Sequence, residues 1–166
     1  MTKKVPSPGL NRDAFLGKAA QDLLYLSSEQ VAVIYERRGL GIPVEVSSTL
    51  LYLARHKNAV LTDISGALDI PHQLAAQRIA KLQKLDLLVK RPDPDDRRRT
   101  HLQLTRTGRE QARVLDRCMA DMATVYKQLY EEIGCDLAKK LNQAIEALKK
   151  RDLAARFDEN FRGDRS

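Results

Sequence analysis

The stretch that decides the fold runs from residue 61 to residue 108 and reads LTDISGALDIPHQLAAQRIAKLQKLDLLVKRPDPDDRRRTHLQLTRTG. Its first part predicts two short helices with almost nothing between them, over Asp63–Asp69 and Pro71–Leu85. We expect Thr62 to cap the first helix, and Pro71 suits the first position of the second, where its missing N–H is not needed. Two helices joined by so tight a turn are typical of a helix-turn-helix.

The second of these helices has two different faces. Ala75, Ile79 and Leu82 keep helical spacing and predict the buried face. The opposite face is small, amide-bearing and basic, and its residues are Gln73, Ala76, Gln77, Ala80, Lys81 and Lys84. A glutamine can make a bidentate contact with N6 and N7 of adenine, so this face suits the major groove of DNA.

A β-hairpin is predicted directly after the helix pair. Leu87-Leu88-Val89 has strand composition, and Pro92-Asp93-Pro94-Asp95 favours a turn. Residues Thr100–Thr105 alternate, with Leu102 and Leu104 inward and His101 and Gln103 outward. Arg97-Arg98-Arg99 lies near the tip of this hairpin, and a hairpin that follows a helix-turn-helix is a wing.

The formal net charge is +7 and it is concentrated in this region. Between His72 and Arg113, eleven basic residues stand against five acidic ones, a net charge of +6. Composition alone fits a solvated surface as well as a site for a polyanion. The position of the arginines on a wing favours the polyanion.

Longer helices are predicted on both sides of this region, over Asn11–Arg38 and Glu45–His56 and from Thr105 onward. The helix after Thr105 carries Ala112, Leu115, Met119, Met122, Tyr126, Leu129 and Ile133 at heptad spacing. Gly134 ends it, and Asp136 can cap a final helix that carries Leu137, Leu141, Ile145 and Leu148, followed by Leu153, Phe157 and Phe161.

We therefore expect an α+β fold, mostly α, built as one domain over residues 11–157. A winged helix-turn-helix lobe at about 45–105 stands between dimerisation helices at 11–38 and 106–157. The flanking segments, 1–10 and 158–166, are predicted to be tails.

Several other classes of protein are disfavoured. The 166-residue chain has no apolar run near the roughly 18 residues of a membrane span. Paired carboxylates, a nucleophile motif and a phosphate-binding glycine loop are also missing from the sequence, so no enzymatic activity is expected. Cys118, Cys135 and the three histidines share no metal-ligand spacing, so we expect no metal, no cofactor and no disulfide.

This order of elements resembles the MarR (multiple antibiotic resistance regulator) family of bacterial transcription factors. The most specific residues are Leu87–Arg99 and Leu102–Gly108, which look like the family's wing and wing-to-helix junction, with its Asp-x-Arg signature at Asp96 and Arg98. The resemblance covers about Asn11–Leu148. It implies a cytoplasmic homodimer held by the terminal helices, with two recognition helices in successive major grooves and two wings in the flanking minor grooves. Many members release DNA when a small, often phenolic, ligand binds between the arms and the DNA-binding lobe.

The chain departs from the family pattern at three places. Pro71 stands where a Ser or Thr often opens the recognition helix, and Asp86 stands where Gly commonly follows it. Aspartate tolerates a left-handed backbone less well than glycine. The exposed face also carries Ala76 and Ala80, so base readout through hydrogen bonds is expected to be sparse.

Each expected contact with DNA has a physical reason. The major-groove set is His72, Gln73, Ala76, Gln77 and Lys81. Arg98 is expected in the minor groove, where a narrow groove attracts guanidinium, and Asp96 orients it. Arg97 and Arg99 are expected to meet phosphates. Further phosphate partners are Thr62, Lys84 and Lys90.

Two further surfaces are assigned. The dimerisation set is Phe15, Leu115, Met119, Met122, Leu141, Ile145, Leu148 and Phe157. Tyr25, Tyr52 and His56 are candidates for an effector pocket, although single aromatic residues on helix faces usually belong to the core.

The prediction is a homodimeric, sequence-specific regulator that binds an inverted repeat in duplex DNA. It is expected to be a repressor that a small effector releases, and the resemblance implies that such effectors are often phenolic. Two alternatives remain. One is a winged-helix module that binds protein and has lost DNA binding. The other is a regulator that senses redox state through Cys118 or Cys135, although nothing beside either thiol clearly lowers its pKa.

Overall fold

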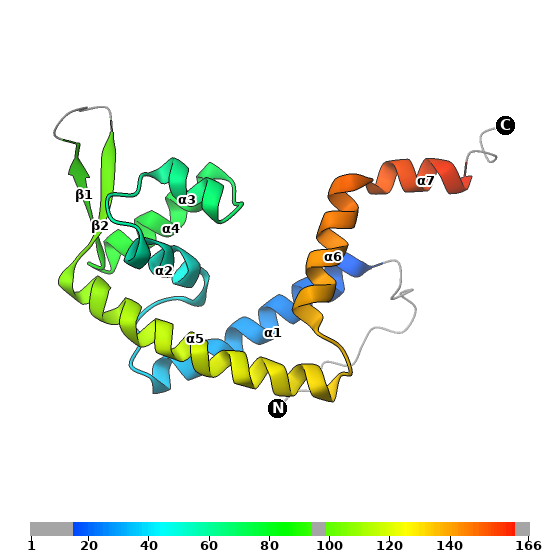
Figure 1. Cartoon of the computed structure of the whole chain (residues 1–166), viewed down its shortest axis with the longest axis horizontal. Coiled ribbons are helices and arrows are strands. Elements are labelled where there is room, and N and C mark those ends of the chain that lie inside the picture. The colour runs from blue at the N-terminus through cyan, green and yellow to red at the C-terminus, as the bar shows by residue number, and fades with distance from the viewer. Residues whose placement is uncertain (1–14, 94–98, 162–166) are drawn as a thin grey trace. The chain divides into compact units, whose positions relative to one another are not determined.

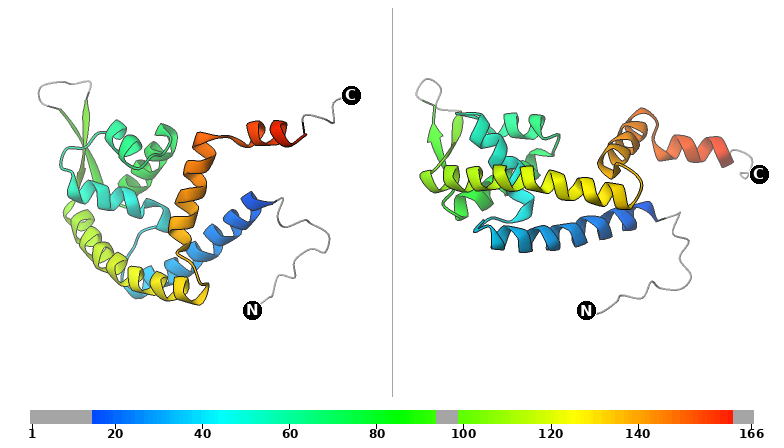
Figure 2. Two further views of the ribbon diagram at one scale, coloured as in Figure 1. Left: turned by 45° about the vertical axis from the view of Figure 1, so that its right-hand side comes forward. Right: turned by 60° about the horizontal axis from the view of Figure 1, so that its bottom comes forward.

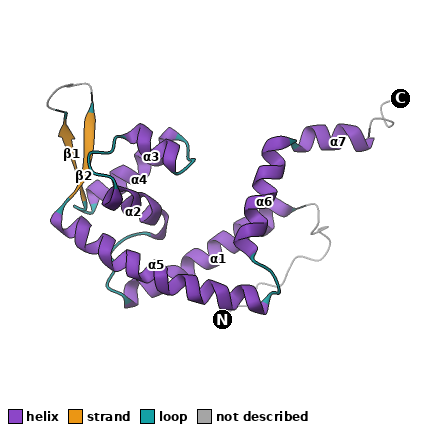
Figure 3. Cartoon of the chain, in the orientation of Figure 1, coloured by secondary structure: helices purple, strands orange, loops and turns teal. Residues whose placement is uncertain are grey.

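The computed structural model describes residues 15–93 and 99–161 and divides into two compact units, residues 1–118 and 119–166. The first unit contains α1 (Leu16–Arg37), the 3-10 helix η2 (Val44–Val46), α2 (Ser47–Arg55), α3 (Leu61–Ala67), α4 (His72–Lys84), β1 (Leu88–Pro92), β2 (Thr100–Leu104) and the start of α5 (Arg106–Glu132) (Figure 1). The second unit contains the rest of α5, then α6 (Leu137–Lys150) and α7 (Leu153–Phe161). Among the described residues the chain is helical apart from one two-stranded hairpin (Figure 3), which confirms the predicted α+β, mostly helical class.

The first unit has its core where α2, α3, α4 and α5 meet. Leu50, Ile64, Leu82 and Leu115, one from each helix, are fully buried. Burying a side chain of this size stabilises the fold by about 1.5–3 kcal/mol. The predicted buried face of α4 is confirmed, because Ala75 and Ile79 are buried together with Leu82.

Helix ends in the first unit are set by left-handed residues. After α1, Gly39 has φ of 70°, and its N–H and that of Leu40 donate to the carbonyls of Glu36 and Tyr35 at 3.0 and 2.9 Å. This is the Schellman arrangement, which satisfies the last carbonyls of a helix. After α4 the same arrangement uses Asp86, with φ of 54°. An aspartate thus adopts the left-handed conformation at the position where the MarR pattern commonly has glycine.

Several predicted boundaries are wrong by a few residues. The segment expected as one helix from Glu45 begins instead as η2, after Pro43 with φ of −66°, and becomes α-helical at Ser47. Pro71 is the N-cap of α4 rather than its first helical residue. The helix α3 starts at Leu61, so Thr62 lies inside its first turn and the carboxylate of Asp63 accepts from the N–H of Val60 at 2.9 Å.

The hairpin pairs Leu88 with Leu104 and Pro92 with Thr100 in antiparallel register. It stands beside the three short helices in both views of Figure 2, and its base leads into α5. The N–H of Leu102 also donates to the carbonyl of Ala59 at 2.8 Å, so the segment before α3 forms an isolated bridge to β2. The hairpin is therefore joined to the helical core at two places, through the bridge to Ala59 and through its base at α5.

In the second unit, two features differ from the sequence analysis and one agrees with it. Asp136 caps α6 as predicted, because its Oδ1 accepts from the N–H of Lys139 at 2.9 Å. The helix ends at Lys150, and a new cap at Asp152, whose Oδ1 accepts from the N–H of Ala155 at 2.7 Å, starts α7. Since α7 continues to Phe161, the tail expected from residue 158 is helical over its first four residues.

Candidate nucleic-acid interface

The exposed face of α4 carries the residues expected to meet a major groove. His72, Gln73, Ala76 and Gln77 are all exposed on the side opposite the buried Ala75. The helix keeps this face outward because its apolar residues recur every three to four positions against α2 and α3. The face therefore offers two amide groups and a methyl-rich surface.

The basic residues in the middle of α4 point elsewhere. Lys81 donates from Nζ to Oε1 of Glu45, in η2, at 2.5 Å. Arg78 donates to Oγ of Ser48, at the start of α2, at 3.3 Å, and its buried Nε has no hydrogen-bond partner among the described residues. The hydrogen bond from Lys81 lowers the pKa of Glu45, and the glutamate's own backbone N–H and the positive charge of Arg78 act in the same direction. Lys81 thus differs from the other major-groove candidates, because it is ion-paired on the flank of the helix.

The wing places part of its predicted phosphate set on the surface. Lys90 in β1 and Arg99 just before β2 are exposed, and so is Lys84 at the end of α4. Thr62 is exposed in the first turn of α3. The predicted contacts Asp96, Arg97 and Arg98 fall on residues 94–98, outside the described part of the chain.

A histidine connects the base of the wing tip to the loop before α3. Nδ1 of His101 lies 2.7 Å from the carbonyl oxygen of Asn58, and Nε2 lies 2.7 Å from Oδ2 of Asp93. We call Asn58, Asp93 and His101 the wing neck. The side chain of Gln103 adds a hydrogen bond to Oδ1 of Asn58 at 2.8 Å.

Sequence reasoning missed the wing neck. It placed His101 on the outer side of β2 and Asp93 in the turn, whereas the His101 side chain is only 19% exposed and lies between Asp93 and Asn58. The third partner, Asn58, lies 43 residues from His101, in a left-handed conformation with φ of 61°. Asparagine adopts this conformation more readily than most residues, but nothing local in the sequence identifies its partner.

The junction between wing and α5 is fixed by Thr105 and Gly108. The hydroxyl of Thr105 donates to the carbonyl of Asp86 at 2.8 Å and accepts from the N–H of Gly108 at 3.0 Å. A Cβ on Gly108 would lie 2.0 Å from the carbonyl oxygen of Leu87. Only a glycine therefore allows the first turn of α5 to approach the start of the wing so closely.

The candidate effector residues are only partly brought together. The rings of Tyr52 and His56 stack with centroids 4.1 Å apart. Tyr25 is 65% exposed on α1, and its pKa is raised by a hydrogen bond and the negative charge of Glu29. Two cavities are described in the first unit, and neither is lined by Tyr25 or Tyr52.

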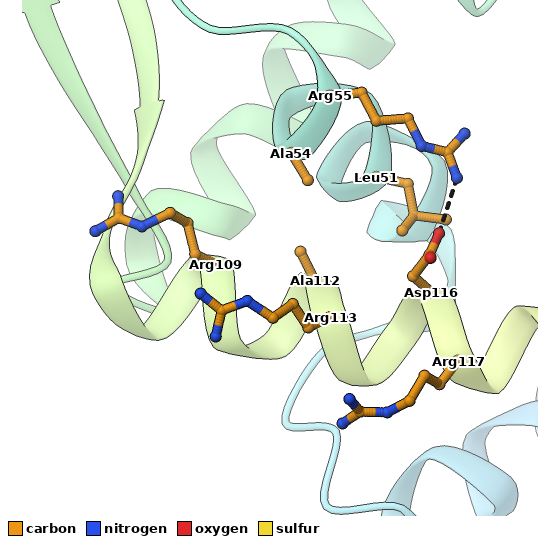
Figure 4. A pocket seen from close by; sticks show the side chains of 8 residues that line it. All are labelled: Leu51, Ala54, Arg55, Arg109, Ala112, Arg113, Asp116 and Arg117. Atoms are coloured by element: carbon orange, nitrogen blue, oxygen red, sulfur yellow. Dashed lines mark hydrogen bonds and ion pairs between the residues drawn. The ribbon is translucent and has the colours of Figure 1, made fainter.

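The larger cavity lies between α2 and α5 and has a volume of about 410 Å³ (Figure 4). Its lining is Leu51, Ala54, Arg55, Arg109, Ala112, Arg113, Asp116 and Arg117. Arg55 forms an ion pair with Asp116 at 2.8 Å, and Arg109 donates to the carbonyl of Leu104 at 2.7 Å. Four guanidinium groups and one carboxylate give this cavity a net positive charge. The smaller cavity, about 270 Å³, is lined in part by His56, Asn58 and Gln103.

The predicted dimerisation residues divide into two groups. Leu115 and Met122 are buried within the single chain. Phe15, Leu141, Ile145, Leu148 and Phe157 are exposed by 37–61%, and Met119 is half-buried. The apolar surface open to a second copy is therefore carried by the exposed group.

Other chemistry finds little support among the described residues. No cluster of three His, Cys, Asp or Glu residues there is arranged to hold a metal ion. Cys118 is buried and Cys135 is half-buried, and both are free thiols. Across the described segments no helix has the length and hydropathy of a membrane span.

A helix pair whose second helix exposes amides, followed by a hairpin with basic residues, defines a winged helix-turn-helix protein. Residues 40–99, which contain η2, α2, α3, α4 and β1 but not β2, match a sequence model of the MarR family. This stretch of the chain is therefore similar to the MarR family. No curated protein sequence is significantly similar to it.

Solved structures share this fold at low sequence identity. A MepR–DNA complex from S. aureus is 21% identical, with a TM-score of 0.65 over 80% of this chain and 98% of that one. The repressor CouR, bound to a 23-mer DNA duplex, is 22% identical with a TM-score of 0.62 over 82% and 94%. A MarR transcriptional regulator from Methanosarcina mazei Go1 is 20% identical with a TM-score of 0.57 over 85% and 98%.

Proposed function

We propose that this chain is a homodimeric transcriptional regulator that binds a specific sequence in double-stranded DNA. The observation that carries the proposal is the exposed face of α4, with Gln73 and Gln77 beside a wing that bears Lys90 and Arg99. Two of the structures similar to this one, MepR and CouR, are complexes with DNA. The match of residues 40–99 to the MarR family model supports the same proposal.

In the proposed complex α4 enters the major groove. Gln73 and Gln77 contact base edges, and the methyl groups of Ala76 and Ala80 allow close approach to thymine methyls. His72 lies at the entry of the helix, where it can donate to a base or a phosphate.

The surrounding contacts hold the protein in register. Thr62, Lys84, Lys90 and Arg99 meet phosphates, which supplies affinity without sequence information. Arg97 joins this set, and Arg98, oriented by Asp96, enters the minor groove. A two-fold dimer would place these contacts on an inverted repeat whose half-sites are one helical turn apart, about 34–36 Å.

The proposal is tested by selecting bound duplexes from random DNA and measuring affinity at several salt concentrations. Gln77→Ala should cost about 1–3 kcal/mol on the selected duplex and leave the salt slope unchanged. Arg99→Ala should weaken binding to all sequences and reduce the slope by about 0.9 for each phosphate that the protein no longer neutralises. Lys140→Ala is the matched control, because it also removes one positive charge from an exposed position, on α6. It should change neither the affinity for DNA nor the salt slope.

Two results would contradict the proposal. Absence of an enriched palindrome would remove sequence-specific binding by a dimer. Absence of salt-dependent binding to any duplex would favour the alternative, a winged-helix module that binds protein.

We further propose that the protein is a repressor released by a small anionic ligand with an apolar body. The cavity between α2 and α5 supports this, because its lining combines the apolar side chains of Leu51 and Ala54 with arginines that include Arg113 and Arg117. Its volume of about 410 Å³ is in the usual range for small-molecule sites. A ligand that bridges α2 and α5 would shift the DNA-binding helices relative to α5.

This second proposal predicts a charge requirement. Benzoate should bind and weaken DNA affinity, whereas benzyl alcohol, which has the same ring and no charge, should not. Arg113→Gln should remove the response to benzoate while DNA binding without ligand is retained. An equal response to both compounds would contradict a site that requires a negative charge. No response to either compound would contradict release by a ligand in this cavity, although the protein could still bind DNA.

A further inference from the structure

The flank of α4 that faces η2 carries a compact set of charges. Lys81 of the recognition helix is hydrogen-bonded to the carboxylate of Glu45 at 2.5 Å, and the positive charge of Arg78 acts on the same carboxylate. Arg78 is itself tied to Ser48 at 3.3 Å. Both cations are thus directed toward the elements that precede the helix-turn-helix, while the amide and methyl groups of α4 point outward.

The ion pair lies in solvent beside the proposed DNA surface. The side chains of Lys81 and Glu45 are 51% and 48% exposed. A pair so exposed contributes little to folding stability, with a typical range of about 0–1 kcal/mol. Its effect on DNA affinity is expected to be larger than its effect on folding stability. The carboxylate of Glu45 neutralises the ammonium group of Lys81, which α4 would otherwise bring toward the groove.

Charge at this point would act on every DNA sequence. Phosphate neutralisation by Lys and Arg supplies essentially all of the affinity for non-specific DNA. With only two glutamines on the exposed face of α4, specific contacts are few, so an extra cation would raise the background against which they compete. A counter-charge on the flank of α4 keeps that background low.

We propose that Glu45 limits the sequence-independent DNA affinity of this protein by neutralising Lys81 on the flank of the recognition helix. The inference rests on the proposed DNA binding and extends it to a residue outside the contact set. Glu45 acts through Lys81, so it is a positioning residue. The competing arrangement has Lys81 leave Glu45 and contact a phosphate directly in the complex.

A double-mutant cycle separates these arrangements. The parent, Glu45→Gln, Lys81→Gln and the double variant are titrated with a duplex selected by the parent and with a scrambled duplex, between 50 and 200 mM salt. Glu45→Gln should steepen the salt slope on both duplexes by about 0.9 per protomer, or about 1.8 per dimer. The fall in affinity across this salt range should then be about tenfold larger than for the parent.

The double variant is the decisive arm. If the pair is neutral toward DNA, removing both charges together restores the parent's slope and its affinity for the scrambled duplex. Lys81→Gln alone should weaken binding, because it leaves the carboxylate of Glu45 facing DNA without its partner. Thermal unfolding checks that all four proteins are folded to the same extent.

Glu146→Gln is the matched control, because it removes the same charge from an exposed ion pair, with Lys149 at 3.3 Å, on α6. It should leave the slope unchanged. Three results would overturn the inference: an unchanged slope in Glu45→Gln, a slope reduced by about 0.9 per protomer in the double variant, or an equal effect of Glu146→Gln. Each of these three results contradicts the role of Glu45 while the parent protein still binds DNA. If the parent protein bound no duplex at all, the proposed DNA binding would be contradicted as well.

Discussion

Among the described glycines, Gly108 has the least space for a side chain. A methyl group there would meet the carbonyl oxygen of Leu87 at 2.0 Å, so the backbone of α5 or of the wing must move. We expect Gly108→Ala to lower the free energy of unfolding by about 1–3 kcal/mol, despite the better helix propensity of alanine. Urea denaturation measures the change.

Gly66 in α3 provides the control for this prediction. It is also helical, but a Cβ there meets nothing within 4 Å. Gly66→Ala should therefore raise the free energy of unfolding by about 0.5–1 kcal/mol. If both substitutions had the same sign, close approach to Leu87 would not be the reason for glycine at position 108.

Asp86 is a residue in a conformation that its side chain disfavours. Its φ of 54° at the end of α4 is left-handed, where a Cβ is strained. We expect Asp86→Gly to raise the free energy of unfolding by about 0.5–1 kcal/mol and Asp86→Ala to lower it by about 1 kcal/mol. Thermal or urea unfolding of the two variants decides, and a gain in stability with alanine would show that the left-handed backbone carries no strain.

At the scale of elements, the wing depends on the wing neck. His101 holds Asp93 and Asn58 through two hydrogen bonds of 2.7 Å, and both acceptors lose the imidazole as a partner if the side chain is removed. His101→Ala should lower the free energy of unfolding by about 1–3 kcal/mol and weaken DNA binding through a less ordered wing. Unfolding and DNA titration measure the two effects.

Thr100→Ala is the neighbouring control in β2. The threonine is exposed, and its replacement should change stability by less than about 0.5 kcal/mol. A His101→Ala protein as stable as Thr100→Ala, with unchanged DNA affinity, would show that the wing keeps its order without the neck.

Local sequence patterns predicted most elements but not how their flanks meet. Three-to-four spacing of apolar residues found α4 and its buried face, and alternation found β2 with Leu102 and Leu104 inward. The destination of Lys81 was not predictable, because a helical pattern shows that a residue lies outside the apolar face but not which distant carboxylate stands beside it. The predicted first residues of α2 and α3 differ from the observed ones, because Pro43 and Asp63 determine where the helices begin through backbone geometry rather than through apolar periodicity. The break before α7 was missed because Leu148 and Leu153 continue an apolar pattern across the cap at Asp152.

At the scale of the whole molecule, the exposed apolar side chains of α6 and α7 predict that a second copy covers them. Ile145 in α6 and Phe157 in α7 are 48% and 61% exposed, which is unusual for residues of this size at helical spacing. We expect a dimer at micromolar concentration, with a thermal midpoint that rises with protein concentration. Ile145→Glu combined with Phe157→Glu should shift sedimentation to the monomer or unfold the chain.

The polar neighbour Glu146 again serves as the control, since Glu146→Gln lies on the same helix and should leave the dimer intact. A doubly substituted protein that sediments as the parent does would place the dimer interface elsewhere. A parent that is monomeric and folded at micromolar concentration would remove the dimer altogether.

The bridge between Ala59 and Leu102 gives the two strands of the wing different surroundings. Leu102 in β2 donates its N–H to Ala59 at 2.8 Å, on the edge away from β1, whereas β1 pairs with β2 alone in the described sheet. Amide protons exchange with solvent deuterium only when such bonds open. In deuterated buffer the amide of Leu102 should therefore keep its proton longer than the outward-facing amides of β1. Isotope labelling would then distinguish β2, with slower amide exchange, from β1, with faster amide exchange.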